Sequence, residues 1–158
     1  MLRRSRGRGF SLLELIAVML VLGMLLAVAV PRLDHGRGVQ ELGYSEQVLT
    51  ALRIAQRRAQ ADGCDIRVTI SASDFQIEQR ATLCSGPFNR DVAGTAAAGS
   101  TLGAAAPAGM PLSAIPGVFY FNSDGAAVDS VGGSPVDVSI IVGLRQIQVV
   151  GTTGYASF

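Results

Sequence analysis

The order of hydrophobic and polar residues divides the chain into an apolar stretch, a helical stretch and a long region with the two-residue period of strands. Residues 10–30 form an almost unbroken apolar run of 21 residues that contains one charge, Glu14. A helix of that length is about 32 Å long, which matches the hydrocarbon thickness of a bilayer. The run predicts a transmembrane helix over residues 10–31, which ends at Pro31 because proline disrupts a helix interior.

A second, amphipathic helical stretch is predicted over residues 32–62, because apolar residues recur there at spacings of three, four and seven. The stripe suits packing on a sheet and comprises Val39, Leu42, Leu49, Leu52, Ala55 and Ala59. Gly36 and Gly38 each disfavour a helix interior by about 1 kcal/mol relative to alanine, so a weak or broken helix is expected across them. Asp62-Gly63 is a typical helix end, with glycine suited to the left-handed cap.

Residues 63–158 have strand-like alternation and turn signals, which together predict a globular domain built from an antiparallel sheet. Residues 66–70 and 75–80 alternate on either side of a short polar segment and indicate a hairpin. Further strands are expected at residues 117–121, 128–131, 136–142, 146–150 and 155–158. The predicted fold class is therefore α+β, with the long N-terminal helix packed on an antiparallel sheet of hairpins.

Residues 85–116 show neither the helical nor the strand period. Much of this segment consists of Ala, Gly, Ser, Thr and Pro, and no charged residue lies between Asp91 and Asp124. A long loop is expected there.

Charge is distributed unevenly along the chain although the formal net charge is only +1. All thirteen basic residues are arginines, and four of them lie within the first nine positions. From Phe10 onward, nine arginines face twelve acidic residues, a net charge of −3. Because basic residues stay on the cytoplasmic side of a membrane helix, the rest of the chain is expected outside the cytoplasm. The alternative is a secretory signal peptide, but its apolar core would be shorter and Pro31 would directly follow the cut.

Cys64 and Cys84 bracket the predicted first hairpin, so its closure brings the two ends together. In an oxidising compartment these residues are expected to form a disulfide. Two free buried thiols remain the alternative. A metal site is not expected, because two cysteines and the distant His35 do not supply four ligands.

The sequence Gly9-Phe10-Ser11-Leu12-Leu13-Glu14 resembles the processing signal of type IV prepilins and type II secretion pseudopilins. The resemblance implies that residues 1–9 are a leader removed by a prepilin peptidase between Gly9 and Phe10. It also implies N-methylation of Phe10, a role for Glu14 as the acidic fifth residue of the mature chain, and a helix kink at Pro31. These proteins are held in the inner membrane with the globular domain in the periplasm, and then enter a pilus or pseudopilus through the N-terminal helix.

Glu14 has a physical role in this scheme. An acidic residue within a membrane helix is unfavourable by roughly 2.5–3.5 kcal/mol near the bilayer centre, so its presence suggests a function. Cleavage creates a cationic amine at Phe10, which Glu14 of a neighbouring subunit can neutralise. A buried charge is tolerated when it is paired, so Glu14 is expected to set the register of assembly.

The remainder of the sequence resembles, more loosely, the GspH/FimT group and the minor pilins of MSHA-type systems. This likeness rests on residues 121–125 and 150–155. A minor pilin near the tip of an MSHA-like pilus is the first expectation, and a minor pseudopilin of type II secretion is the second. Some FimT-type proteins bind DNA through a Gly-Arg-x-Arg motif, but residues 143–146 read Gly-Leu-Arg-Gln. Because the body is also acidic, nucleic acid is not an expected partner.

No enzyme is expected from this sequence. The chain contains one histidine, and the acidic residues of its C-terminal third lie in turns, where aspartate is favoured locally. Arg53, Arg57 and Arg58 lie mostly off the apolar stripe and indicate a solvated helix face rather than a nucleic-acid patch. No cofactor, catalytic residue or metal ligand is predicted.

Overall fold

A computed structural model describes residues 12–29, 36–82, 84–94 and 101–158. The chain divides into two units, Met1–Gly38 and Val39–Phe158, and we call the second the head domain. In the first unit, helix α1 (Leu12–Ala29) occupies the predicted apolar run. Its side chains are almost all apolar, and Glu14 is its one charged residue.

Helix α2 (Gly36–Asp62) is the long amphipathic helix predicted from the apolar stripe. It ends where expected, because Gly63 adopts a positive φ of 65°. The prediction of a weak or broken helix across Gly36 and Gly38 is wrong, because both residues lie within α2. A methyl group at Gly38 would meet no atom within 4 Å. The glycine penalty of about 1 kcal/mol is small beside the packing that stabilises most helices in proteins.

The predicted stripe on α2 is confirmed in its C-terminal part and wrong at its start. Four of its members are buried in the head domain, namely Leu49, Leu52, Ala55 and Ala59. Val39 and Leu42 are 69% and 42% exposed. Tyr44, Val48 and Ala51 join the buried face, which the simple spacing of leucines did not reveal.

The first sheet has the strand order β3-β2-β1-β6-β7, with the short β4 also paired to β2. The predicted hairpin is confirmed as β1 (Ile66–Ile70) and β2 (Asp74–Thr82), joined so that Ile70 pairs with Phe75. β6 (Val118–Phe121) pairs with the other side of β1, and β7 (Ala127–Val128) follows a turn. Alternating residues of these strands are buried and form one wall of the core.

The expectation of a long loop over residues 85–116 is wrong. This segment contains β3 (Ser85–Asp91), β4 (Ala104–Ala105) and β5 (Leu112–Ile115), and it places Val92 and Leu102 in the core. β3 is almost wholly exposed, so no apolar alternation marks it in the sequence. Backbone pairing with β2 and contacts of the Phe88 ring hold it in place.

The second sheet is antiparallel and has the order β10-β9-β8-β5. β8 (Val138–Val142) and β9 (Arg145–Val149) are the predicted hairpin, and β10 (Ala156–Ser157) adds an edge. The predicted single sheet is therefore two sheets. Near their junction, the backbone N–H of Ala127 donates to Gly151 O at 2.8 Å, linking β7 to the end of the second sheet.

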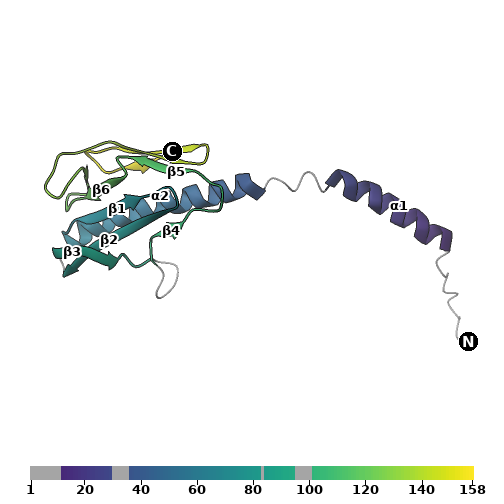
Figure 1. Cartoon of the computed structure of the whole chain (residues 1–158), viewed down its shortest axis with the longest axis horizontal. Helices are drawn as coiled ribbons and strands as arrows, with labels where there is room; N and C mark the ends of the chain where they lie inside the picture. Colours follow the sequence, from purple (N-terminus) through teal and green to yellow (C-terminus); the bar gives the residue numbers. More distant parts are fainter. Residues whose placement is uncertain (1–11, 30–35, 83, 95–100) are drawn as a thin grey trace, which may run out of the picture. The chain divides into compact units, whose positions relative to one another are not determined.

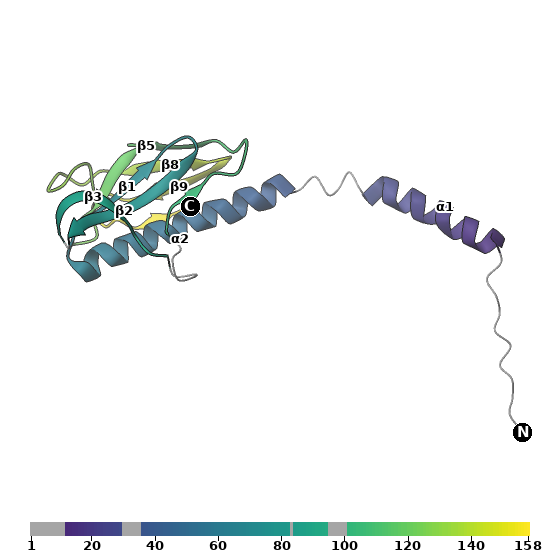
Figure 2. The same cartoon turned by 60° about the horizontal axis from the view of Figure 1, so that its bottom comes forward.

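One core joins α2 to both sheets. It combines the buried face of α2 with inward residues of the first sheet, such as Phe119 and Phe121, and of the second, such as Ile140 and Ile147. Figures 1 and 2 show α2 running along the strands of the head domain. The predicted α+β class, with a helix packed on antiparallel strands, is confirmed.

Candidate functional site: the N-terminal helix and the head domain

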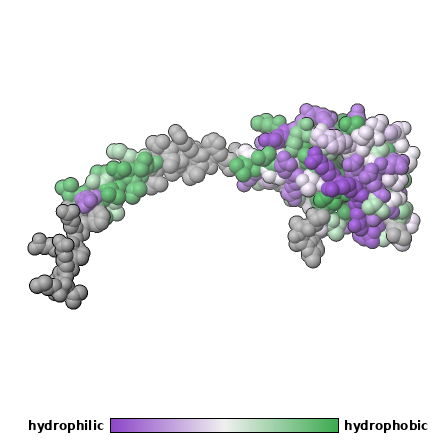
Figure 3. Space-filling model, turned by 180° about the vertical axis from the view of Figure 1, so that it is seen from behind, coloured by the Kyte–Doolittle hydropathy of each residue, from purple (hydrophilic) through white to green (hydrophobic). Residues whose placement is uncertain are grey.

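Glu14 lies in the first turn of α1, where the unpaired N–H groups of a helix favour a carboxylate. The large apolar side chains of α1 between Leu12 and Leu25 are 47–77% exposed. Figure 3 shows this surface as mainly hydrophobic, whereas the face of the head domain in the same view mixes hydrophilic and hydrophobic residues. Such an exposed apolar surface is typical of a segment that meets a membrane or other helices.

One face of α1 combines the carboxylate with small and branched apolar side chains. Glu14, Ala17, Val18, Val21 and Leu22 follow the three- and four-residue spacing of a single helix face and line a shallow hollow. This face offers one negative charge within an apolar surface. It is suited to a neighbouring helix that brings one positive charge.

The other residues predicted in this segment, Gly9, Phe10 and Pro31, lie outside the described residues. Within the residues that the structure describes, no helix has both the length and the hydropathy needed to cross a membrane.

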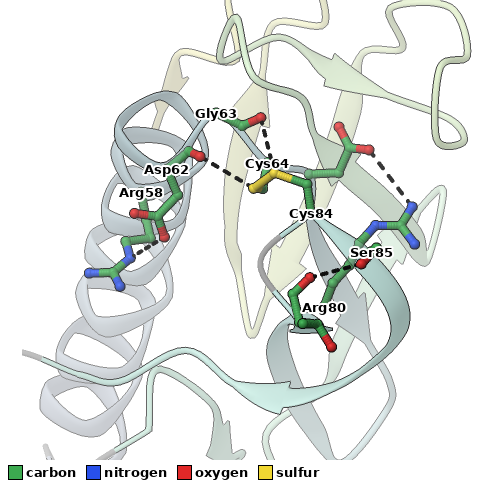
Figure 4. Close-up of a disulfide and its surroundings, with 9 residues drawn as sticks. Arg58, Asp62, Gly63, Cys64, Arg80, Cys84 and Ser85 are labelled. Atoms are coloured by element: carbon green, nitrogen blue, oxygen red, sulfur yellow. Dashed lines mark hydrogen bonds and ion pairs between the residues drawn. A yellow bond between two sulfur atoms is a disulfide. The ribbon is translucent and has the colours of Figure 1, made fainter.

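Cys64 and Cys84 are joined by a disulfide in the head domain. Cys64 follows the end of α2 and is 8% exposed, whereas Cys84 lies in the turn between β2 and β3. Figure 4 shows the bridge beside Asp62 and Gly63, with the Arg58–Asp62 ion pair on the last turn of α2. The bridge thus ties the C-terminal end of α2 to the first sheet.

Polar side chains of α2 hold strand β10 and the turns that follow β6 and β9. Arg53 donates twice to Ala156 O, at 3.2 and 3.1 Å. The amide of Gln56 donates to Gly125 O and Thr153 O, and Gln60 donates to Asp124 O at 3.0 Å. Arg53, Gln56 and Gln60 recur every three or four positions, as the residues of any solvated helix face do. Their hydrogen bonds to distant backbone carbonyls therefore could not be predicted from the sequence.

Tyr44 is a buried polar residue that the sequence analysis did not single out. Its side chain is 5% exposed, its ring lies edge-on to Phe75, and its hydroxyl donates to Ala104 O at 3.1 Å. Burial, together with the nearby negative charge of Asp74, raises the pKa of Tyr44 to about 12. The phenol therefore serves as a neutral hydrogen-bond donor that fastens β4 to α2.

Arg57 and Arg58 form local contacts on α2, in agreement with the predicted solvated face, whereas Arg53 reaches Ala156 O of β10. Arg58 pairs with Asp62 four residues later, and Arg57 donates to Arg53 O. In the turn compared with the DNA-binding motif, Arg145 lies with Cζ 5.7 Å from the centroid of the Phe158 ring. Among the described residues, no group of three or more His, Cys, Asp and Glu side chains is placed to hold a metal ion.

Comparison with known proteins gives a match for the N-terminal segment and another for the fold. Residues 4–30 match the prokaryotic N-terminal methylation motif. The structure is similar to that of the minor pseudopilin EpsH from the type 2 secretion system of Vibrio cholerae, with a TM-score of 0.51 and 15% sequence identity. The match covers 75% of this chain and 94% of that one. The search of curated proteins gives no match.

The motif match and the fold similarity agree with each other. Residues 4–30 carry the N-terminal methylation motif, and the chain has a fold similar to that of a minor pseudopilin. The methylation motif covers the segment that holds Glu14, while the fold similarity reaches into the head domain. The resemblance inferred from the sequence is confirmed at this level.

Proposed function

We propose that this pilin-like chain is a minor subunit of a type II secretion pseudopilus. The observation that carries the proposal is the combination of the methylation motif at residues 4–30 with the fold of a minor pseudopilin. The role is structural rather than catalytic. Its partners are a prepilin peptidase, other pilin-like subunits and the inner membrane.

Processing begins with removal of residues 1–9 by the prepilin peptidase, between Gly9 and Phe10, followed by methylation at Phe10. Residues 10–31 then hold the chain in the inner membrane as a single-pass anchor, with the head domain in the periplasm. The four arginines before Phe10 support this orientation, because basic residues remain cytoplasmic. The Cys64–Cys84 disulfide suits an oxidising compartment such as the periplasm.

Assembly transfers α1 from lipid to a bundle of neighbouring helices. The Glu14 carboxylate then pairs with the amine of Phe10 on an adjacent subunit, and Pro31 bends the chain beyond the anchor. A misregistered subunit leaves both charges unpaired in an apolar environment. Removing one partner of a buried ion pair is unfavourable by about 3–5 kcal/mol, so register is strongly selected.

The assembly step is tested by replacing Glu14 in the full-length chain. Glu14→Gln removes the charge and nearly preserves the shape, whereas Asp129→Asn removes a carboxylate from an exposed turn of the head domain. We expect both variants to be cleaved normally, as judged by the intact mass. Glu14→Gln should copurify with the filament at least about tenfold less than Asp129→Asn, because it loses the buried pair. Equal incorporation of the two variants contradicts the proposed role of Glu14.

The choice of machine is tested by deleting the gene and measuring secreted exoenzymes and surface pili in the same cultures. Loss of secretion with normal pili is expected for a pseudopilin. Loss of pili with normal secretion would instead establish the second candidate, a minor pilin of an MSHA-like pilus. The likeness of residues 121–125 and 150–155 to MSHA-type minor pilins favours that candidate.

A DNA-uptake pilin of the FimT type is the third candidate and has the least support. The turn at residues 143–146 carries one arginine, and Arg145 faces an aromatic ring. Salt-sensitive binding of duplex DNA by the full-length chain in detergent would support it, because phosphate contacts release counterions.

A further inference from the structure

The outward face of the second sheet has an unusual composition for a surface. All residues of its four strands are described, and the strand register places seven side chains on this face, in two rows. None of them is charged. The set, which we call the uncharged face, comprises Ser113, Ile141 and Gln146 in one row, and Ile115, Ser139, Gln148 and Ser157 in the other.

Charges occur only around this face. Arg145 is the one charged residue in the four strands, and it lies at the start of β9 beside the Phe158 ring. Asp137 precedes β8, and its carboxylate accepts a hydrogen bond from the N–H of Gly151 at 2.7 Å. An uncharged centre with a polar rim is the arrangement found in protein interfaces.

The outward face of the first sheet is built differently. There, Arg67 donates to Glu78 at 2.6 Å across the β1–β2 pair, and the guanidiniums of Arg67 and Arg80 both lie near the Phe88 ring. Those charges are matched within the head domain itself. The lack of charge on the second sheet is therefore a local feature and not a property of the whole domain.

Three large apolar side chains are exposed on or beside the uncharged face. Ile115 and Ile141 are 79% and 44% exposed, and Leu144, at the tip of the β8–β9 turn, is 97% exposed. The tip is fixed from two sides. The N–H of Leu144 donates to Glu41 Oε1 at 2.6 Å, and the N–H of Gly143 donates to Pro111 O at 2.9 Å.

The fixed tip means that Leu144 is presented by a preorganised turn. Because little conformational freedom remains to be lost there, binding through this side chain is less opposed by entropy. Single exposed leucines are ordinary, but three exposed apolar residues around an uncharged sheet face form a coherent patch.

The size of the face limits what it can bind. Four strands of two to five residues, spaced by about 4.8 Å and rising about 3.3 Å per residue, present roughly 250 Å². A stable pairwise complex buries about 800 Å² on each partner. The face is too small to hold a dimer by itself, but it can contribute specificity to an assembly whose subunits are already held together elsewhere.

We propose that the uncharged face docks on the head domain of a different, neighbouring pilin-like subunit in the filament. This inference rests on the proposed function, in which the N-terminal helices supply the main association. The neighbour presents a surface that is likewise uncharged, because an unpaired charge against this face would be desolvated without compensation.

The first test places a charge in the centre of the face in the full-length chain. Ile141→Lys is compared with Val118→Lys, because Val118 lies in a strand of the first sheet with a similar exposure of 42%. Thermal unfolding of both variants in detergent verifies that they fold. We expect Ile141→Lys to lower copurification with the filament by about tenfold, while Val118→Lys leaves it unchanged, because a charge buried in an interface without a partner is disfavoured.

Equal copurification of the two variants overturns the inference. If the unsubstituted chain does not copurify with any filament, that result contradicts the proposed function itself, whatever the two variants do. The two failures are therefore distinguishable.

The second test identifies the occupant. A photo-reactive phenylalanine analogue is placed at Ile141 of the full-length chain in cells, with the same analogue at Val118 as the control. The expected product from Ile141 joins this chain to a second protein that carries a methylated N-terminus. A product of twice the chain's own mass, a lipid adduct, or the same products from both positions would overturn the proposal.

Discussion

The disulfide between Cys64 and Cys84 makes a sharp prediction about the stability of the head domain. The perturbation is the double variant Cys64→Ser with Cys84→Ser, which removes the bridge and replaces each sulfur with a similarly small polar group. Cys84 is exposed, so its substitution disturbs little packing, whereas Cys64 is buried at 8% exposure and its substitution adds a packing loss that reduction of the unsubstituted protein does not share. The main expected effect is the loss of the constraint on the unfolded chain.

The magnitude follows from the length of the closed loop. The two cysteines are 20 residues apart in sequence. In the chain-entropy description, closing a loop of that length stabilises the folded state by about 3.3 kcal/mol at 25 °C. For a domain of this size, each kcal/mol corresponds to about 2–8 °C, so we expect the melting temperature to fall by roughly 10 °C or more.

The assay is thermal and urea unfolding of the full-length protein in detergent, followed by far-ultraviolet circular dichroism. Reduction of the unsubstituted protein with dithiothreitol should reproduce the instability of the double variant, whereas the same reductant should not affect the double variant. If the double variant unfolds within about 1 kcal/mol of the unsubstituted protein, the entropic reasoning is refuted.

Three further changes test other parts of the head domain. Gly154→Ala should destabilise the head domain by at least about 2 kcal/mol more than Gly132→Ala in urea unfolding. Both glycines have a positive φ, but a methyl group at Gly154 would collide with Gly125 O, whereas one at Gly132 meets no atom within 4 Å. Equal losses of stability would contradict this close approach. Raising the pH from 10 to 12 should lower the free energy of unfolding by about 2 kcal/mol through Tyr44, because its pKa is about 12 in the folded state against an ordinary value of 10.0. Within that window the unfolded state releases the phenolic proton more readily than the folded state does. Tyr44→Phe should remove this part of the pH dependence, and an unchanged slope would refute it. Phe88→Ala should raise the rate of amide hydrogen exchange in β3 by at least about tenfold while β1 stays protected, because contacts of the Phe88 ring with Arg67 and Arg80 stabilise this edge strand. An equal change in exchange rate in both strands would contradict this role of Phe88.

The elements that sequence predicted well are those with a strong period and a clear boundary. The hairpin of β1 and β2 alternates strictly, and the helix α2 ends at Asp62-Gly63 as its cap chemistry requires. The fold class followed from these elements, because a long amphipathic helix and successive hairpins leave few ways to bury their apolar faces.

The elements that sequence analysis missed depend on distant partners. β3 is exposed along almost its whole length, and its position is set by pairing with β2 and by arginines of two other strands. The N-terminal end of α2 shows the opposite error. Val39 and Leu42 continue the apolar period but extend past the head domain's core, and a period alone does not show where the opposing sheet stops.

The candidate site in α1 can be proposed from the sequence because its chemistry is local in sequence. A carboxylate that follows a basic segment and lies within an apolar run can be recognised without any tertiary contact. The uncharged face could not be recognised in this way. Its seven residues come from four strands in three separate segments, and only the register shows that they share one surface.

This difference bears on how a filament of similar subunits is ordered. Apolar helices attract one another with little discrimination, since most of their surface is equally suited to lipid or to any neighbouring helix. In the proposed assembly, Glu14 adds a constraint on axial register, because its charge would have to meet an amine, but every subunit with the same motif would meet that constraint equally. Discrimination among subunits must therefore come from the head domains, where sequences are free to differ. In this chain one sheet face satisfies its own charges and the other carries none, so the second is the surface on which a choice of neighbour can depend.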